Sequence, residues 1–246
     1  MMLSDLVKEK QKVTCLIYCA PGVGKSTFLG LIGEQSKGKT LILDIDRTFV
    51  PTMTKNEVVH DFERMEVIKV DNVNTWDDWQ AKLIELGDAK KAGTLDYENI
   101  CIDNLSELER CILSDLGQKG KNKGVPAQAD YQYMQFKLVN SLRFLKALGV
   151  NVYITAWEIN EQFQNPDGSS YTRLYPRVSA EIVDNICGLC FDMTRVPTVE
   201  RFCEEYANAV YAMFGGRKEL VHKLMDYLSH LHPTFSISGE VKLAYG

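Results

Sequence analysis

The stretch "LIYCAPGVGKST", from Leu16 to Thr27, constrains the fold of this chain more than any other. An apolar run leads into a glycine-bearing turn, and a helical pattern that opens at Ser26 follows at once. The turn matches the pattern G-x-x-x-x-G-K-[ST] from Gly24 onward, while Cys19 holds the place of the first glycine. A strand that passes through such a turn directly into a helix is the opening unit of an α/β sheet.

The turn has the chemistry of a phosphate-binding loop. Gly22 and Gly24 let main-chain N–H groups approach a phosphate closely. Lys25 supplies positive charge, and Ser26 supplies a hydroxyl for magnesium. The first glycine of the pattern has a conformational role, so the small Cys19 can replace it where φ stays negative. The residues expected to bind the nucleotide are Ala20, Pro21, Gly22, Val23, Gly24, Lys25, Ser26 and Thr27.

Apolar runs and helical patterns alternate along most of the chain. Nearly continuous apolar runs predict strands covered on both faces, and amphipathic spacing predicts helices between them. The predicted strands are 13–18, 40–46, 65–70, 97–103 and 149–158. The predicted helices are 26–36, 75–91, about 106–116 and about 129–147. This order predicts an α/β fold with a three-layer, mostly parallel sheet.

Two polar stretches interrupt the alternation, and a third region follows it. Residues 118–128, "QKGKNKGVPAQ", predict a basic loop that contains glycine. Residues 159–179 carry the turn sequence "NPDG" between extended segments and predict a hairpin or a mobile loop. Residues 197–246 have helical and strand-like patterns, and we expect them to form a short C-terminal extension of a core that spans 1–196.

Carboxylates at the ends of predicted strands indicate a metal and hydrolysis site. Asp103 ends an apolar strand, and beside a phosphate loop it is the expected partner of Ser26 in holding Mg²⁺. Hydrolysis also needs a group that orients or deprotonates water. Many P-loop ATPases place a glutamate for this purpose directly after the strand aspartate, but in this chain the residue after Asp103 is Asn104. The candidates are therefore Asp44 and Asp46, which lie two apart on the same side of a strand's end in "LILDIDRT", and Glu158 at the end of "YITAWE".

Four stretches resemble the RecA-like ATPases in their order and spacing: "APGVGKST", "LILDIDRT", "NICIDNLSE" and "VNVYITAWE". Within that group the chain looks most similar to the small phage-encoded nucleotide-binding proteins that act as single-strand annealing recombinases. The resemblance covers about residues 12–196. It implies a RecA-like core that binds ATP and Mg²⁺ and hydrolyses ATP.

The resemblance also implies roles for single residues. The catalytic acid of RecA-like proteins ends the strand after the phosphate loop, where this chain has Asp46, one methylene shorter than glutamate. Asp46, Lys25 and Glu158 are the catalytic candidates. In RecA-like proteins the core strand that precedes the second of two DNA-binding loops ends in a residue that senses the γ-phosphate. The resemblance places that strand at "NVYITAWE", where the sensor candidates are Thr155, Trp157 and Glu158.

The two interrupting stretches fall where RecA-like proteins carry their DNA-binding loops. The formal net charge of −5 excludes a general attraction to nucleic acid, so binding requires a local basic patch. Single-stranded DNA needs positive charge together with planar groups on which bases stack. The candidates are Lys119, Lys121 and Lys123 in 118–128, and Arg173 and Arg177 in 159–179, where tyrosines are interleaved.

Basic residues beyond the core are candidates for completing a neighbouring protomer's site, as RecA-like ATPases often do. The "GGRK" stretch offers Arg217 and Lys218. We therefore expect a homo-oligomer, with 197–246 packed on the core or on a neighbouring protomer, and a single-strand binding protein as a further partner. The chain has no run of eighteen apolar residues and no signal-peptide segment. A cytoplasmic location without membrane contact is expected, in the host cytoplasm for a phage-encoded protein.

The leading interpretation is an ATP-hydrolysing protein that binds single-stranded DNA and supports phage recombination or strand annealing. One alternative is a nucleotide-dependent assembly or binding protein without significant turnover, which follows if Asp46 cannot act on water. The other is a small-molecule kinase, which needs an arginine-rich lid, and residues 118–128 contain lysines but no arginine.

Overall fold

The structure is a computed structural model of the 246-residue chain. It describes residues 12–56, 63–69, 75–164, 168–179, 182 and 189–192. The predicted extension 197–246, including the trans-acting candidates Arg217 and Lys218, lies outside these residues.

The described strands form one seven-stranded sheet in the order β3-β2-β4-β5-β1-β7, with β6 paired to β5. The pairings are parallel except for the antiparallel pair of β5 and β6. The strands are β1 Thr14–Cys19, β2 Lys39–Asp44, β3 Met65–Lys69, β4 Tyr97–Asp103, β5 Asn151–Gln164, β6 Ser170–Pro176 and β7 Leu189–Asp192. Because parallel strands point the same way, the carboxyl ends of β1, β2, β4 and β5 meet at one edge, where ligands of α/β sheets bind.

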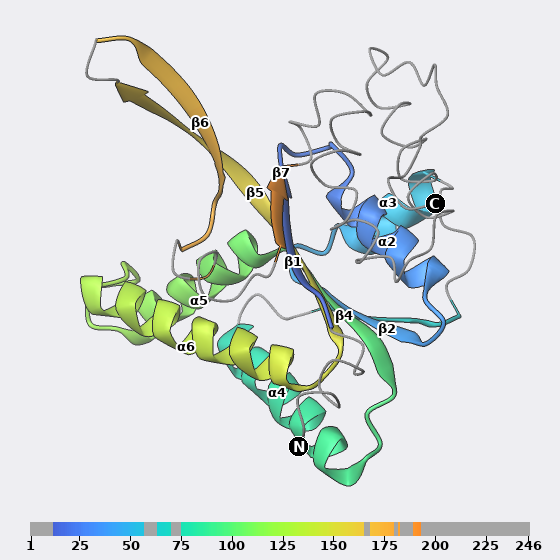
Figure 1. The fold of residues 1–246 in the computed structure, drawn as a ribbon. Helices are drawn as coiled ribbons and strands as arrows, with labels where there is room; N and C mark the ends of the chain where they lie inside the picture. Colours follow the sequence, from blue (N-terminus) through green and yellow to red (C-terminus); the bar gives the residue numbers. More distant parts are fainter. Residues whose placement is uncertain are drawn as a thin grey trace, which may run out of the picture.

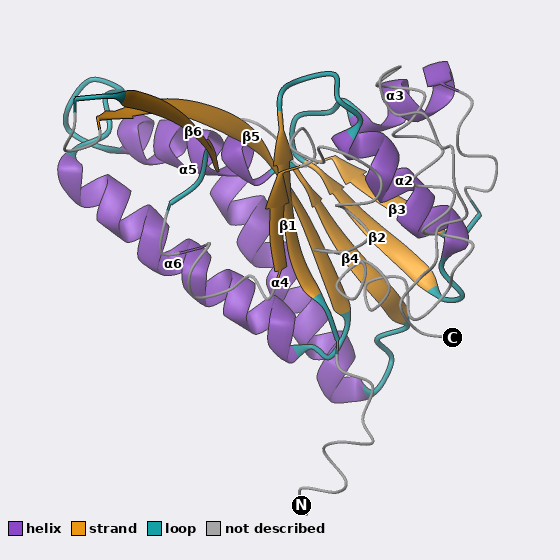
Figure 2. Cartoon of the chain, turned by 45° about the horizontal axis from the view of Figure 1, so that its top comes forward, coloured by secondary structure: helices purple, strands orange, loops and turns teal. Residues whose placement is uncertain are grey.

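Helices cover both faces of this sheet, so the predicted three-layer α/β fold with a mostly parallel sheet is confirmed. The helices are α2 Lys25–Gln35, α3 Phe49–Asn56, α4 Thr75–Ala92, α5 Leu105–Lys119 and α6 Gln128–Ala147. Figures 1 and 2 show α2 and α3 on one face and α4, α5 and α6 on the other.

The core explains why the strands read as nearly continuous apolar runs. Ile17 in β1, Ile42 in β2 and Ile100 in β4 are fully buried, because helices cover both sides of the sheet. Trp76 and Trp79 are also buried, and both belong to the α4 side of the core. Their spacing in the sequence predicts this packing of α4 against the sheet.

One helix, α3, is absent from the sequence prediction. Pro51 lies in its first turn, and Phe49 and Met53, four residues apart, are buried. Both are signals of a short amphipathic helix. The β-branched residues of "FVPTMTKN" weaken the helical pattern, and packing of α3 against α2 compensates for that weakness.

Two elements are longer than predicted. α5 runs to Lys119 rather than to about residue 116, and Lys119 pairs with Asp115 one turn earlier at 3.0 Å. β5 continues to Gln164 because β6 pairs with it from Glu158 onward. Residues 159–179 therefore form the hairpin that the sequence offered as one of two alternatives.

Two remaining observations concern the membrane and the cysteines. None of the helices that the structure describes is long and apolar enough to cross a membrane. Four described cysteines, Cys15, Cys19, Cys101 and Cys111, are buried and form no disulfide bond.

Candidate active site

The loop between β1 and α2 has the backbone conformation that a phosphate cradle requires. β1 ends at Cys19, and α2 begins at Lys25. Between them Gly22 has φ 83° and Gly24 has φ 111°, both in the left-handed region that favours glycine. The backbone conformation of the loop thus favours glycine at both positions.

The N-terminus of α2 is left open by the chain itself. Its N-cap Gly24 has no side chain to accept a hydrogen bond, and the first turn contains no acidic residue. By contrast, the Asn104 side chain caps α5 by accepting the N–H of Glu107 at 2.9 Å. The first N–H groups of α2 therefore remain available, with the positive end of the helix dipole, for an anion.

Lys25 is 8% exposed and folds back onto the loop. Its Nζ donates to the carbonyl oxygens of Cys19 at 2.8 Å and of Ala20 at 3.0 Å, and it lies 3.7 Å from the Cys19 Sγ. These contacts hold the ammonium group over the loop. In the same first turn of α2 the Thr27 hydroxyl is buried and has no hydrogen-bond partner among the described residues.

The geometry of Cys19 predicts that the missing glycine matters little. Cys19 is an extended strand residue, and the described non-glycine residues with positive φ are Arg47 and Lys123. A Cys19→Gly variant is therefore expected to change ATP affinity by less than about threefold, which is below 1 kcal/mol. Titration calorimetry with Mg-ATP measures this. A tenfold or larger gain in affinity would show that the cysteine impairs the loop.

Three carboxylates gather at the edge of the sheet beside this loop. Asp44 and Asp103 end the neighbouring strands β2 and β4 and are direct register partners. Ligand oxygens of Asp44, Asp46 and Asp103 all lie within 4.8 Å of one another. The sequence offers Asp44 and Asp46 as neighbours on one strand end, and the fold brings both to Asp103.

Asp103 is almost completely buried, and its two carboxylate oxygens differ. Oδ1 accepts the Thr155 hydroxyl from the neighbouring strand β5 at 2.6 Å. Oδ2 is buried and has no hydrogen-bond partner among the residues described. Burial raises the pKa of Asp103 to about 6; the hydroxyls of Ser26 and Thr155 lower it, and Asp46 and Asp44 raise it. Such a carboxylate is costly without a cation.

Asp46 is half-buried and is held in place by its neighbours. Its Oδ1 accepts the Thr48 hydroxyl at 2.6 Å, and its Oδ2 accepts the Asn104 side-chain amide at 3.3 Å. Among the described carboxylates, Glu158 is not part of the cluster that contains Asp46. The Glu158 Oε2 is buried without a hydrogen-bond partner in the described part of the chain. The structure thus brings Asp46, but not Glu158, to Asp103.

Trp157, a sensor candidate, instead joins the β5–β6 hairpin to α5. It is the register partner of Cys19, and its main-chain N–H donates to the Ser106 hydroxyl oxygen at 3.0 Å. The guanidinium groups of Arg110 and Arg177 lie over its ring, with 5.4 and 5.9 Å to the centroid. Of the sensor candidates, Thr155 is the one that touches Asp103. The role of Arg110 has no signal in the sequence, because α5 meets Trp157 only in the fold.

A second contact links α5 to the hairpin and predicts a pH effect on stability. Burial raises the pKa of Glu109 to about 7, while the Ser179 N–H, which donates to its carboxylate at 3.1 Å, lowers it. The folded protein therefore binds this proton more tightly than the unfolded chain, whose pKa is near 4.5. Stability is full below pH 4.5 and falls as the pH rises through about 7, by at most about 3 kcal/mol.

Urea unfolding at about pH 5 and about pH 8 checks this effect. Glu109→Gln keeps the acceptor for Ser179 but has no proton to lose, so its stability should exceed that of the wild type at the higher pH. The control is Glu85→Gln, at a carboxylate that is 65% exposed. If Glu109→Gln and the wild type show parallel pH curves, the carboxylate does not titrate in this window.

The DNA-binding candidates occupy two elements that project to the same side of the sheet (Figures 1 and 2). Lys119 ends α5 and pairs with Asp77 at 3.2 Å as well as with Asp115, so part of its charge is already neutralised. Lys121 and Lys123 are exposed in the α5–α6 connection. Arg177 follows β6 and is exposed, and Arg173 lies within β6 opposite Glu161.

Comparisons with known proteins give a domain family and a structural neighbour for this chain. A family model described as an AAA domain, AAA_24, matches residues 11–208. No curated protein matches the sequence. Among solved structures, the chain is similar to a prototypical ATPase from the type III secretion system of pathogenic bacteria, with 13% sequence identity and a TM-score of 0.48. The match covers 87% of this chain but only 62% of the length of that ATPase chain.

Proposed function

Because this chain belongs to the AAA_24 family of AAA domains and carries a P-loop ATPase domain of that type, we propose that it hydrolyses ATP, binds single-stranded DNA and supports phage recombination or strand annealing. The observation that supports ATP hydrolysis best is the juxtaposition of an open helix N-terminus with a buried, unpaired carboxylate oxygen of Asp103. The proposal includes the RecA-like character of the core and its assembly into a homo-oligomer.

The phosphate loop supplies the binding step. The N–H groups at the start of α2 would bind the phosphates, and the Lys25 ammonium would move from the Cys19 and Ala20 carbonyls to a phosphate oxygen. That exchange replaces two neutral acceptors with an oppositely charged one, which adds Coulomb attraction to the hydrogen bond. Binding energy is thus concentrated on the phosphates.

The acidic cluster fits a divalent cation. The free Oδ2 of Asp103 is an oxygen ligand of the type that Mg²⁺ prefers, and the Ser26 hydroxyl lies beside the same carboxyl. Asp44 and Asp46 add carboxylates within the 4.8 Å cluster. Bound there, Mg²⁺ would neutralise charge on the phosphate oxygens.

Asp46 is the residue that we propose to orient or deprotonate the attacking water. It is half-buried, so water can reach it, and its contacts with Thr48 and Asn104 fix its direction. Asn104 takes the position after Asp103 where other P-loop ATPases place a glutamate, and it acts as a helix cap and as a donor to Asp46. Glu158 remains the alternative base, at the start of the hairpin.

DNA binding is proposed for the exposed basic residues of the hairpin and of the α5–α6 connection. Trp157 connects this region to the phosphate loop, because it lies beside Cys19 and its ring contacts both Arg177 and Arg110. A change at the phosphate loop can therefore alter the base of the hairpin. A single-strand binding protein is proposed as a partner on the same DNA.

Steady-state ATPase assays with and without single-stranded DNA test the proposal. Stimulation of turnover by DNA supports it. Phosphate transfer to a metabolite would instead establish a small-molecule kinase, and tight ATP binding without turnover would establish a nucleotide-dependent assembly protein. Either of these two results would overturn the proposed function.

Replacing Lys121 and Lys123 with alanine is expected to weaken binding of single-stranded DNA, because both charges are exposed and available for phosphates. The slope of log affinity against log salt should fall in magnitude by about 1.4, at roughly 0.7 per phosphate contact. Fluorescence anisotropy over a salt series measures both quantities. Lys119→Ala should have a smaller effect, since Lys119 already pairs with Asp77 and Asp115.

The control for that measurement is the removal of two other exposed lysines, Lys37 just after α2 and Lys146 in the last turn of α6. It removes the same net charge at other places. Equal losses of affinity in the two double variants would show that only total charge matters and that the α5–α6 connection is not the DNA site.

A further inference from the structure

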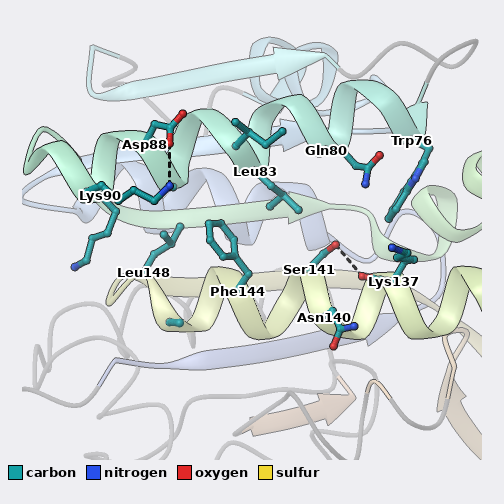
Figure 3. Close-up of a pocket in the computed structure, with 14 residues that line it drawn as sticks. Trp76, Gln80, Leu83, Asp88, Lys90, Lys137, Asn140, Ser141, Phe144 and Leu148 are labelled. Carbon is teal, nitrogen blue, oxygen red and sulfur yellow. Dashed lines mark hydrogen bonds and ion pairs between the residues drawn. The ribbon is translucent and has the colours of Figure 1, made fainter.

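A groove runs between α4 and α6, on the face of the sheet opposite α2 (Figure 3). Its volume is about 570 Å³. Apolar side chains from both helices line it, among them Leu83 and Ile84 from α4 and Phe144 and Leu148 from the α6 side. None of these residues belongs to the phosphate loop, the acidic cluster or the hairpin.

The groove exposes apolar surface that a solvated helix face would not ordinarily carry. Ile84 is 65% exposed and Phe144 is 37% exposed. Phe136, two turns before Phe144 on α6, is 66% exposed. Ile84 and Phe144 line the same groove, and exposed apolar side chains that gather in this way mark an interaction surface more often than an isolated exposed residue does.

Gly87 allows the two helices to approach closely at the floor of the groove. A Cβ at this position would lie 2.9 Å from the Phe144 ring. The Phe144 ring can therefore rest against the α4 backbone, which leaves space above it. A groove of this kind between two paired helices can bind a third helix, whose side chains at spacings of three and four residues enter the groove.

The rim of the groove is positively charged although the chain as a whole carries −5. The charged lining residues are Asp88, Lys90, Lys91 and Lys137, which sum to +2. Lys91 pairs with Asp88 at 3.1 Å. In the described part of the chain no carboxylate forms an ion pair with Lys90 or Lys137, and the Lys137 Nζ lies 5.5 Å from the centroid of the Tyr133 ring. Both charges can therefore form ion pairs with carboxylates of a partner.

We propose that the groove docks an acidic amphipathic helical segment of a partner protein. Apolar side chains of that segment fill the space between Ile84 and Phe144, and its carboxylates meet Lys90 and Lys137. Nucleic acid fits less well, because a chain of phosphates would leave the apolar walls of the groove exposed. The complementary charges set which partner binds and how fast it associates.

The probe is a fluorescein-labelled synthetic peptide of about 16 residues, with leucine at positions three and four apart and glutamate elsewhere. Its counterpart carries lysine in place of every glutamate. Fluorescence anisotropy with the full chain should show binding of the acidic peptide and at least tenfold weaker binding of the basic one. Combining Lys90→Glu with Lys137→Glu should reverse this preference.

Two further variants separate charge from shape. Ile84→Asp lies at an exposed position, so the fold tolerates it, and it should weaken binding of the acidic peptide about tenfold or more by placing a carboxylate where an apolar side chain docks. Lys146 is exposed on α6, the helix that carries Lys137, but it does not line the groove. Lys146→Glu is therefore the matched control for the lysine variants and should leave peptide binding unchanged.

Three outcomes would overturn the proposal. The first is equal affinity of the wild type for the acidic and the basic peptide. The second is equal loss of binding with Lys146→Glu and with the groove variants. The third is a change of oligomeric state in Ile84→Asp, seen by light scattering without peptide, which would make the groove an interface between copies of this chain. Competition by single-stranded DNA for the peptide would assign the lysines to DNA and would equally contradict the proposal.

Discussion

Replacing Lys25 with alanine is expected to weaken binding of Mg-ATP by about 100-fold or more, roughly 3 kcal/mol, and to abolish turnover. The ammonium group is the only side-chain charge that the loop 20–27 offers to the phosphates. It is already held over the loop by the Cys19 and Ala20 carbonyls. Alanine leaves those carbonyls without their donor and the phosphate charge without its counterion.

Titration calorimetry with Mg-ATP and a phosphate-release assay measure the two parts of this expectation. Lys37→Ala is the matched control, because Lys37 is exposed just beyond the end of α2 and its loss should leave both quantities unchanged. Circular dichroism establishes that the Lys25 variant is folded. Retention of ATP affinity within threefold in a folded Lys25→Ala protein would show that the loop is not the nucleotide site.

Replacing Asp103 with asparagine is expected to reduce turnover by about 100-fold or more while leaving the fold intact. The amide oxygen can still accept the Thr155 hydroxyl, which donates at 2.6 Å in the present structure. However, the negative charge of the carboxylate that would bind Mg²⁺ is lost. The variant also removes a buried carboxylate whose raised pKa, caused chiefly by burial, shows that its charge is costly in the folded state.

Activity and stability should therefore change in opposite directions at this position. Phosphate release should fall, while the melting temperature at pH 8 in the presence of EDTA should equal or exceed that of the wild type. Asp115→Asn is the comparison, since Asp115 is also a buried carboxylate but lies in α5, where it pairs with Lys119. Asp115→Asn should lower stability and spare turnover. The reverse pattern would assign Asp103 a structural role alone.

The order and type of the core elements could be predicted because each signal is local. The strand and helix patterns from residue 13 to 158 match β1, α2, β2, β3, α4, β4, α5, α6 and β5, with differences at the ends. The ends differ because tertiary partners extend them: β6 prolongs β5, and the ion pairs of Lys119 prolong α5. α3 was missed because packing, rather than propensity, stabilises it.

The candidate site divides in the same way. The conformation of Gly22 and Gly24 follows from the motif itself, and Cys19 is extended, as a tolerated substitution requires. Sequence spacing offers Asp46 and Glu158 equally, since both follow apolar strands. Only the strand order decides that Asp46 reaches Asp103, because β2 is the neighbour of β4 and ends in register with it.

By itself the sequence determined the fold class, the phosphate loop and the strand that carries Asp103, because these depend on periodicity and on residues close together in the chain. The tertiary structure decided which carboxylates meet, which lysines are already paired, and where apolar surface remains exposed. The contact of Arg110 with Trp157 and the groove of Ile84 and Phe144 join elements that are far apart in sequence. No local pattern encodes such contacts, since they arise only when helices pack on a sheet of a particular strand order.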